Sequence, residues 1–406
     1  MKIRKAYKYR LKAKQEQEAL FRQQAGCCRF VWNKALALQK ERLDGGEKVL
    51  RYVEIAKLLT GWKKEEETVW LAEAQSQTMQ QTLKFLDQAI KEAFDKKNPK
   101  RFPRFKKKGK STDSFRYPQG FKLDGNRIFL PKIGWVRFIK SREIEGSLRN
   151  VTVSRRGDHW YVSIQTEREI AEPIHPSVSS VGIDLGVTRF ATLSDGSFLE
   201  PLNSSKKLEE KLAKEQRRLA RKKKLSTNWK KQKKKITRLH IRIADARNDY
   251  LHKSSATISK NHAIVYVEDL KIRNMSRSAA GTTEAPGKNV RVKSGLNRAI
   301  LDQGWFEFRR QLEYKLAWAG GWLVSVPPRN TSRTCPACGH IAKENRKTQA
   351  QFRCLDCGFE ENADHVGAIN ILRAGHARFA CEVSGAVMPP AAGTRQGNYT
   401  EAFALA

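Results

Sequence analysis

Two pairs of cysteines carry the most specific chemical signal in the sequence. Cys335 and Cys338 form one Cys-x-x-Cys pair, and Cys354 and Cys357 form a second one after fifteen intervening residues. Four thiolates at this spacing fit the tetrahedral coordination of one Zn²⁺ ion. Because cysteine fills all four positions, we expect a closed structural site, a zinc ribbon over 333–358 whose folding depends on the metal. A metal site in place of a disulfide framework also indicates a reducing compartment.

Three acidic residues, Asp184, Glu268 and Asp364, suit a second metal centre. The first lies within an apolar stretch that reads as a buried strand, the second near the end of a later apolar strand, and the third on a predicted helix towards the end of the chain. An ionised carboxylate in an apolar strand is costly unless a cation pairs with it. This order of acids is the RNase H-like arrangement, in which carboxylates hold two divalent cations about 3.5–4 Å apart for phosphodiester hydrolysis.

Two of these assignments have competitors. Asp184 could instead cap a turn beside Gly186 at the end of its strand. Asp269 follows Glu268 directly, and strand alternation puts the two side chains on opposite faces without deciding between them. The sequence holds no Ser/His/Asp or Cys/His arrangement, Walker loop or dinucleotide glycine motif that would offer a rival chemistry.

The charge of the chain indicates its partner. The 406 residues include 79 Lys and Arg against 42 Asp and Glu, a formal net charge of +37. A positive excess of this size predicts a polyanionic partner, and nucleic acid is the first choice over an anionic membrane surface. No apolar run approaches the roughly 20 residues of a membrane span, and no signal peptide opens the chain. We therefore expect an intracellular protein without a membrane partner.

Two basic segments are candidates for contacting nucleic acid. Residues 96–110 hold nine Lys or Arg and no acid, with two phenylalanines interleaved. A solvated linker is the competing interpretation, but the rings favour a segment that grips phosphates and stacks on bases. The second segment is a predicted helical hairpin over 204–253, with fifteen Lys or Arg against three Glu in 206–235. The predicted contact residues are Lys100, Arg101, Arg104, Phe105, Lys106, Lys107, Arg221, Lys222, Lys230 and Lys234.

The elements around these residues divide the chain. The first part of the chain is predicted to be a small antiparallel barrel or sheet that is split by a helical insertion. The expected strands are a basic one at 3–11 and short ones at 127–130, 135–139, 151–155 and 160–165, and the expected helices are at 15–43, 52–59 and 68–94. After a linker at 171–176, the Asp184 strand leads a meander with strands at 188–193 and 197–199. A mobile loop at 271–298, a helix at 303–319 and a strand at 322–326 follow, and the chain is expected to be disordered beyond 380.

Several segments together resemble the transposon-encoded TnpB (OrfB) proteins. The resemblance covers nearly the whole chain to about residue 373 and rests on Val181–Gly186, Val265–Leu270, Thr331-Ser332-x-x-Cys335-x-x-Cys338-Gly339, Phe352-x-Cys354-x-x-Cys357-Gly358 with Asn362-Ala363-Asp364, and Gly26-x-x-Arg29-Phe30-Val31-x-Asn33. It implies an RNA-guided DNA endonuclease related to type V CRISPR effectors, with a RuvC-type core that uses Asp184, Glu268 and Asp364. It also favours Glu268 over Asp269, because the family motif is Glu-x-Leu after an apolar strand.

The resemblance implies a multidomain α+β and α/β fold. Its parts are a β-barrel wedge domain (1–14 and 111–172), a helical recognition lobe with the basic linker (15–110), the RNase H-like core (177–332 and 359–378), the inserted zinc ribbon (333–358) and a disordered tail (379–406). The implied cofactors are one structural Zn²⁺ and two catalytic Mg²⁺, which Mn²⁺ can replace. The implied partners are a guide RNA from the mobile element and double-stranded target DNA, which is recognised next to a short adjacent motif. The resemblance also implies a monomeric ribonucleoprotein in the prokaryotic cytoplasm, associated with the nucleoid.

One departure from the family concerns the third acid. The family segment is Arg-Asp-x-Asn-Ala-Ala, whereas this chain has Ala363-Asp364-His365-Val366-Gly367-Ala368. The aspartate is kept with less polar support around it, which puts the rate of reaction in question and not its type. Two other functions share these features: a transposase with the same core, and an RNA-guided DNA-binding regulator with an inactive core.

Overall fold

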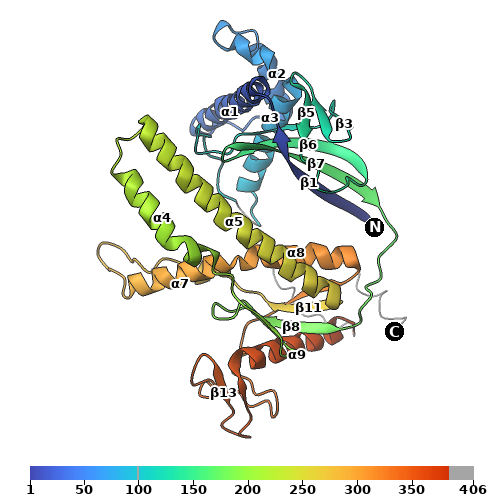
Figure 1. Cartoon of the computed structure of the whole chain (residues 1–406), viewed down its shortest axis with the longest axis vertical. Coiled ribbons are helices and arrows are strands. Elements are labelled where there is room, and N and C mark those ends of the chain that lie inside the picture. Colours follow the sequence, from blue (N-terminus) through green and yellow to red (C-terminus); the bar gives the residue numbers. More distant parts are fainter. Residues whose placement is uncertain (98–99, 384–406) are drawn as a thin grey trace. The chain divides into compact units, whose positions relative to one another are not determined.

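The computed structural model describes residues 1–97 and 100–383 of the chain (Figure 1). The chain forms two compact units, one from Met1 to Ala171 and one from Glu172 onward. None of the helices in the described ranges is long and apolar enough to cross a membrane. Domain boundaries finer than these two units stay predictions.

The first unit is built on a seven-stranded sheet in the order β2-β6-β7-β1-β5-β4-β3. The N-terminal strand joins it as predicted, because β1 pairs antiparallel with β7 through residues 2–10 and with β5 through Leu11 and Lys12. The pairings leave β2 and β3 at the two edges, so the predicted closed barrel is not confirmed. The strands are β1 (Lys2–Lys12), β2 (Ser114–Tyr117), β3 (Lys122–Asp124), β4 (Arg127–Leu130), β5 (Gly134–Phe138), β6 (Ser147–Arg156) and β7 (His159–Glu169).

The helices of this unit pack on the sheet through one apolar core, in which the ring of Phe21 lies 5.1 Å from that of Trp160. They are α1 (Gln15–Asp44), α2 (Tyr52–Trp62), the 3₁₀ helix η1 (Glu66–Glu73) and α3 (Ser76–Ala93). The prediction of one helix over 68–94 is therefore wrong in its first third. The side chain of Gln24 on α1 accepts a hydrogen bond from the backbone N–H of Gln75 and holds the extended residues between η1 and α3.

The second unit contains a five-stranded sheet in the order β10-β9-β8-β11-β12. Strands β8, β11 and β12 are parallel, while β9 and β10 complete the predicted meander in antiparallel pairings. The second meander strand is shorter than predicted, because residues 185–190 form a turn in which the N–H of Gly186 donates to the carbonyl of Phe190. The strands are β8 (Ser180–Asp184), β9 (Ala191–Leu193), β10 (Phe198–Leu199), β11 (Ile264–Glu268) and β12 (Trp322–Val326).

Helices cover both faces of this sheet (Figure 1). The face that carries Val265 and Val267 packs under α5 (Thr227–Asn261) and α8 (Trp305–Ala319), and the face that carries Tyr266 packs on α9 (Ala363–Val383). With α4 (Ser204–Ala220), α5 forms the predicted hairpin. The predicted loop at 271–298 is partly wrong, since it contains α6 (Ile272–Met275) and the start of α7 (Val290–Gln303).

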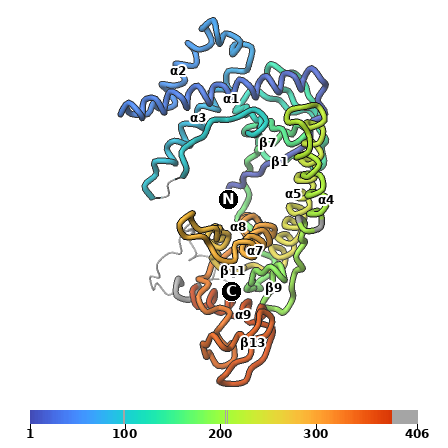
Figure 2. Tube along the Cα trace, turned by 90° about the vertical axis from the view of Figure 1, so that its left-hand side faces the viewer, coloured from blue at the N-terminus to red at the C-terminus, as the bar shows by residue number. Residues whose placement is uncertain are grey.

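The second cysteine pair lies beside a two-stranded antiparallel sheet, β13 (Gln351–Arg353) with β14 (Glu360–Asn362). Figures 1 and 2 both show this module beside α9 at the edge of the second unit. Helix α9 starts at the end of β14, carries Asp364 as predicted, and continues to Val383. The predicted disordered tail is therefore wrong for residues 379–383, and its remainder, 384–406, lies outside the described residues.

Candidate metal centres and nucleic-acid surfaces

The four cysteines of the two pairs come together in one cluster. Their sulfur atoms all lie within 4.8 Å of one another, and no other group of three or more potential ligands in the described parts of the chain is gathered in this way. The Cys335–Cys357 and Cys338–Cys354 sulfur distances are both 3.6 Å. A zinc ion bonded to sulfur at about 2.3 Å in a tetrahedron separates its ligands by nearly this distance. The cluster therefore fits one structural Zn²⁺.

Each cysteine pair closes a tight turn. The backbone N–H of Gly339 donates to the carbonyl of Cys335 at 3.0 Å, and that of Gly358 donates to Cys354 at 3.2 Å. Both glycines have positive φ angles, 80° and 73°, which glycine adopts at little cost. These turns place both sulfurs of a pair on the same side of the chain, as a metal knuckle requires.

The first two acids lie at the same edge of the five-stranded sheet. Val267 pairs with Ile183 in the parallel register of β11 and β8, so that Glu268 and Asp184 are the final residues of neighbouring strands. Asp184 is largely buried, and burial raises the pKa of its carboxyl to about 7, aided by the negative charges of Glu268 and Asp364. Burial also raises the pKa of Glu268. Glu268 and Asp364 are thus close enough to disfavour the ionisation of Asp184, an effect that a shared cation would reverse.

The third acid enters from the first turn of α9. The backbone N–H of Asp364 donates to the side chain of Asn362 at 3.0 Å, which fixes the start of the helix. One turn later, a Cβ atom on Gly367 would lie only 2.8 Å from the Asp184 carboxylate. A Cβ on Gly182 would likewise meet the backbone of α9 at 2.3 Å, at the carbonyl of Ala368. Both glycines let α9 approach β8 closely, and this contact brings the third acid to the first.

The departures from the family segment have structural partners. Ala363 and Val366 are fully buried and pack with Phe352, Cys335 and Cys354 in the small core of the cysteine module. Gly367 provides the space that Asp184 occupies. The residues around the third acid therefore join the cysteine module to the sheet, which accounts for their apolar character.

Glu268 and Asp269 differ in what they contact. Asp269 forms ion pairs with Arg309 at 3.0 Å and Lys271 at 2.8 Å. Glu268 accepts a hydrogen bond of 2.6 Å from the hydroxyl of Thr331. Asp269 is thus neutralised by side chains of the protein, whereas Glu268 shares its strand edge with Asp184.

Sequence reasoning missed one charged residue of this centre, Arg346. Its guanidinium lies 3.3 Å from the Asp364 carboxylate, and its charge lowers the pKa of Asp184 and of Glu268 against the effect of burial. Arg346 lies between the two cysteine pairs, in a segment without any periodic pattern. Only the folded cysteine module brings it to the acids.

The basic segment of the first unit is attached to α1. The Asn33 side chain exchanges two hydrogen bonds with the backbone of Lys106, and the Trp32 indole donates to the carbonyl of Arg104. The Lys106 ammonium lies 3.8 Å from the centre of the Trp32 ring, where burial lowers its pKa. Lys106 is therefore occupied by a cation–π contact. Five of the predicted contact residues, Lys100, Arg101, Arg104, Phe105 and Lys107, are exposed.

The basic residues of the hairpin are placed differently. Arg221, Lys230 and Lys234 are exposed, and Lys222 is half-buried. Apolar residues of α5, Ile236, Leu239 and Ile243, are buried at helical spacing on its other side. The hairpin thus presents a row of cations to solvent, as a surface that follows a phosphate backbone would.

Comparison with known proteins places this chain in a family. A family model described as "Probable transposase" (OrfB) matches residues 161–279, the model "Cas12f1-like, TNB domain" matches 305–371, and a "Helix-turn-helix domain" model matches 1–48, where the structure has β1 and α1. An Escherichia coli (strain K12) protein named "Putative RNA-guided DNA endonuclease InsQ" is 55% identical over 94% of this chain and 94% of its own length. A "Putative RNA-guided DNA endonuclease" from Streptomyces pristinaespiralis is 35% identical over 93% of this chain and 91% of its own length.

Among solved structures, a Cas12f1–sgRNA–target DNA complex covers 91% of this chain and 99% of that chain at 19% identity. Its TM-score of 0.31 is too low to equate the two folds. The sequence identity to the E. coli protein extends over nearly the full length of both chains, and this identity is sufficient to assign the family. The chain belongs to the transposon-encoded TnpB (OrfB) family.

Proposed function

We propose that this protein is an RNA-guided DNA endonuclease of a mobile element, which hydrolyses target DNA next to a short adjacent motif in a RuvC-type core. The placement of Asp184 and Glu268 at the ends of adjacent parallel strands, with Asp364 on a helix packed against the first strand, carries this proposal. The strand order, with three antiparallel strands followed by two parallel ones, supports an RNase H-like core. The two relatives named as RNA-guided DNA endonucleases support the guided activity.

The carboxylates of Asp184, Glu268 and Asp364 would hold two Mg²⁺ ions, which supply activation of water and stabilisation of the leaving 3′ oxygen. Thr331 orients Glu268 through its hydroxyl. Arg346 offsets part of the negative charge at Asp364. Asp184 is only partly exposed to solvent, so a cation between the acids is attracted more strongly than it would be in bulk water.

The basic surfaces would bind the nucleic acids. Base pairing with the guide RNA would select the sequence, while the protein would read duplex shape and the adjacent motif. The exposed cations of the α4–α5 hairpin and of the segment 100–110 offer phosphate contacts. We expect one chain to assemble with one guide RNA transcribed from the mobile element.

The proposal is tested by the RNA that co-purifies with the protein. A discrete RNA species should be recovered, and the ribonucleoprotein should cut a DNA duplex that matches its guide in the presence of Mg²⁺. Asp184→Ala should abolish cutting while RNA binding persists. Recovery of only heterogeneous cellular RNA would contradict the guided function, and cutting by Asp184→Ala would contradict the site.

A transposase is the second candidate, because the family model that matches residues 161–279 is described as "Probable transposase". A transposase would join the cut ends to a second DNA molecule. Sequencing the products distinguishes the two functions: free ends support the endonuclease, and joined ends support the transposase.

A further inference from the structure

An aromatic side chain is exposed beside the proposed nuclease centre. Phe306, the second residue of α8, is 73% exposed, although it belongs to one of the most apolar residue types. Its neighbour Trp305 is 4% exposed and packs in the core of the second unit. Single exposed apolar side chains are common on protein surfaces, so the exposure of this ring indicates a partner only together with its position beside the acids.

Phe306 lies next to the proposed catalytic residues. It lines a small cavity of about 40 Å³ together with Glu268, with Leu185, which follows Asp184, and with Arg309. The Trp305 indole N–H in the same lining is buried without a hydrogen-bond acceptor among the described residues. The cavity is too small to admit a nucleobase, so a base bound here would lie against the outer face of the phenyl ring.

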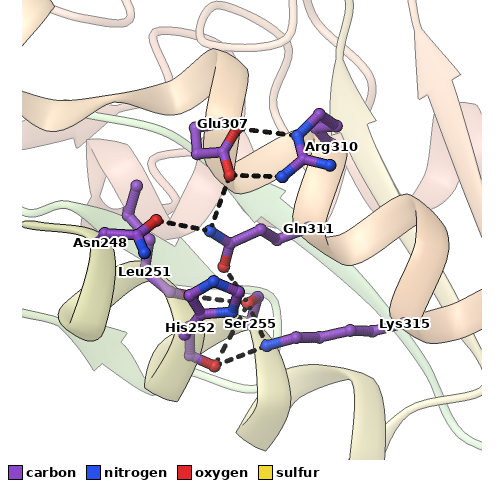
Figure 3. A network of polar contacts seen from close by, with 8 residues as sticks. All are labelled: Asn248, Leu251, His252, Ser255, Glu307, Arg310, Gln311 and Lys315. Carbon is purple, nitrogen blue, oxygen red and sulfur yellow. Dashed lines mark hydrogen bonds and ion pairs between the residues drawn. The ribbon is translucent and has the colours of Figure 1, made fainter. Parts of the chain in front are cut away.

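The helix that carries Phe306 is fixed in place by a polar network between α8 and α5 (Figure 3). Glu307 accepts hydrogen bonds from Arg310 and from Gln311, and Gln311 contacts Ser255 of α5 at 3.0 Å. One turn further on, the Lys315 ammonium donates to the Ser255 hydroxyl and to the carbonyl of His252. The first turns of α8 are therefore locked to a long helix, and the ring position does not depend on a loop.

We propose that Phe306 stacks on a nucleobase of the DNA strand being cut and so positions the scissile phosphate at Asp184 and Glu268. This inference rests on the proposed endonuclease function. A single strand must reach the acids for hydrolysis, and aromatic rings bind single strands by stacking on bases irrespective of sequence. Arg309 lies in the same lining, where hydrogen bonds to Asp269 and Ser325 hold its guanidinium in place.

The test compares Phe306→Ala and Phe306→Trp with a matched control, Phe198→Ala. Phe198 is 44% exposed on edge strand β10, in the same unit. Stacking of one base predicts that Phe306→Ala slows cleavage of bound DNA about tenfold or more. Phe306→Trp should keep the rate because it keeps the ring, and Phe198→Ala should cut as the parent does. Equal cleavage rates for Phe306→Ala and the parent would overturn the proposal.

A fluorescence measurement separates this proposal from the endonuclease function. The target duplex carries 2-aminopurine at positions flanking the cut site, and Ca²⁺ replaces Mg²⁺ so that binding proceeds without hydrolysis. Stacking predicts quenching at one position with the parent and with Phe306→Trp, and recovery of the signal with Phe306→Ala. If the parent cuts DNA but shows no ring-dependent quenching, the stacking proposal fails alone. If quenching occurs but no cutting is found in Mg²⁺, the endonuclease function fails.

Discussion

Replacing Asp184 with asparagine should stabilise the metal-free protein while abolishing its cleavage activity. The folded protein holds the pKa of this carboxyl at about 7, against an ordinary value of 3.8, chiefly because the group is buried. The folded state thus binds the proton more tightly than the unfolded state. Between about pH 4 and pH 7 the metal-free fold therefore loses stability as the pH rises, and the loss is complete above pH 7.

The size of the effect follows from the two pKa values. The difference between 7 and 3.8, at about 1.4 kcal/mol for each pH unit, sets a ceiling of about 4 kcal/mol on the cost of ionising Asp184. Asn has nearly the same shape as the protonated acid and removes this cost. We expect Asp184→Asn to raise the free energy of unfolding by up to that amount at pH 8, and by much less at pH 5.

The assay is urea unfolding of RNA-free protein in magnesium-free buffer at both pH values, with zinc left bound. In a second series, Mg²⁺ should stabilise the parent, since it pairs with the ionised carboxylates, and should have little effect on the variant. An Asp184→Asn variant that is no more stable than the parent at pH 8 would refute the reasoning. So would an increase in stability of equal size at pH 5.

Three further predictions concern the other sites. Cys354→Ser should reduce the bound zinc and unfold the cysteine module, measured by metal content and by proteolysis between 333 and 362, because a structural zinc site contributes roughly 10–16 kcal/mol to folding. Glu268→Gln should abolish cleavage without loss of stability. Asp269→Asn should keep cleavage and lower the free energy of unfolding by about 1–3 kcal/mol, because it breaks charged hydrogen bonds to Lys271 and Arg309. Loss of cleavage only in the Asp269 variant would reverse the assignment. Lys106→Ala should lower stability by about 1 kcal/mol through its lost ring contact, while Lys107→Ala should leave stability unchanged and reduce the salt dependence of RNA binding by about one unit of log–log slope.

The sequence alone determined the chemistry that depends on local patterns. The two Cys-x-x-Cys pairs predicted a four-thiolate cluster, and the structure brings the sulfurs together, because each knuckle is a turn of a few residues with a glycine behind it. The meander behind the Asp184 strand and the α4–α5 hairpin followed from periodicity and turn residues in the same way. Such features form among near neighbours, so their residue types suffice to predict them.

Only the tertiary structure decided how distant residues meet. The register of β8 and β11 sets Asp184 beside Glu268, Arg346 reaches Asp364 through the folded cysteine module, and Phe306 lines the same cavity as Glu268. The break between η1 and α3 lies at Gln75, whose backbone N–H donates to the side chain of Gln24, 51 residues earlier in the chain. These contacts join segments with long stretches of chain between them, and local pattern carries no information about which of them come together.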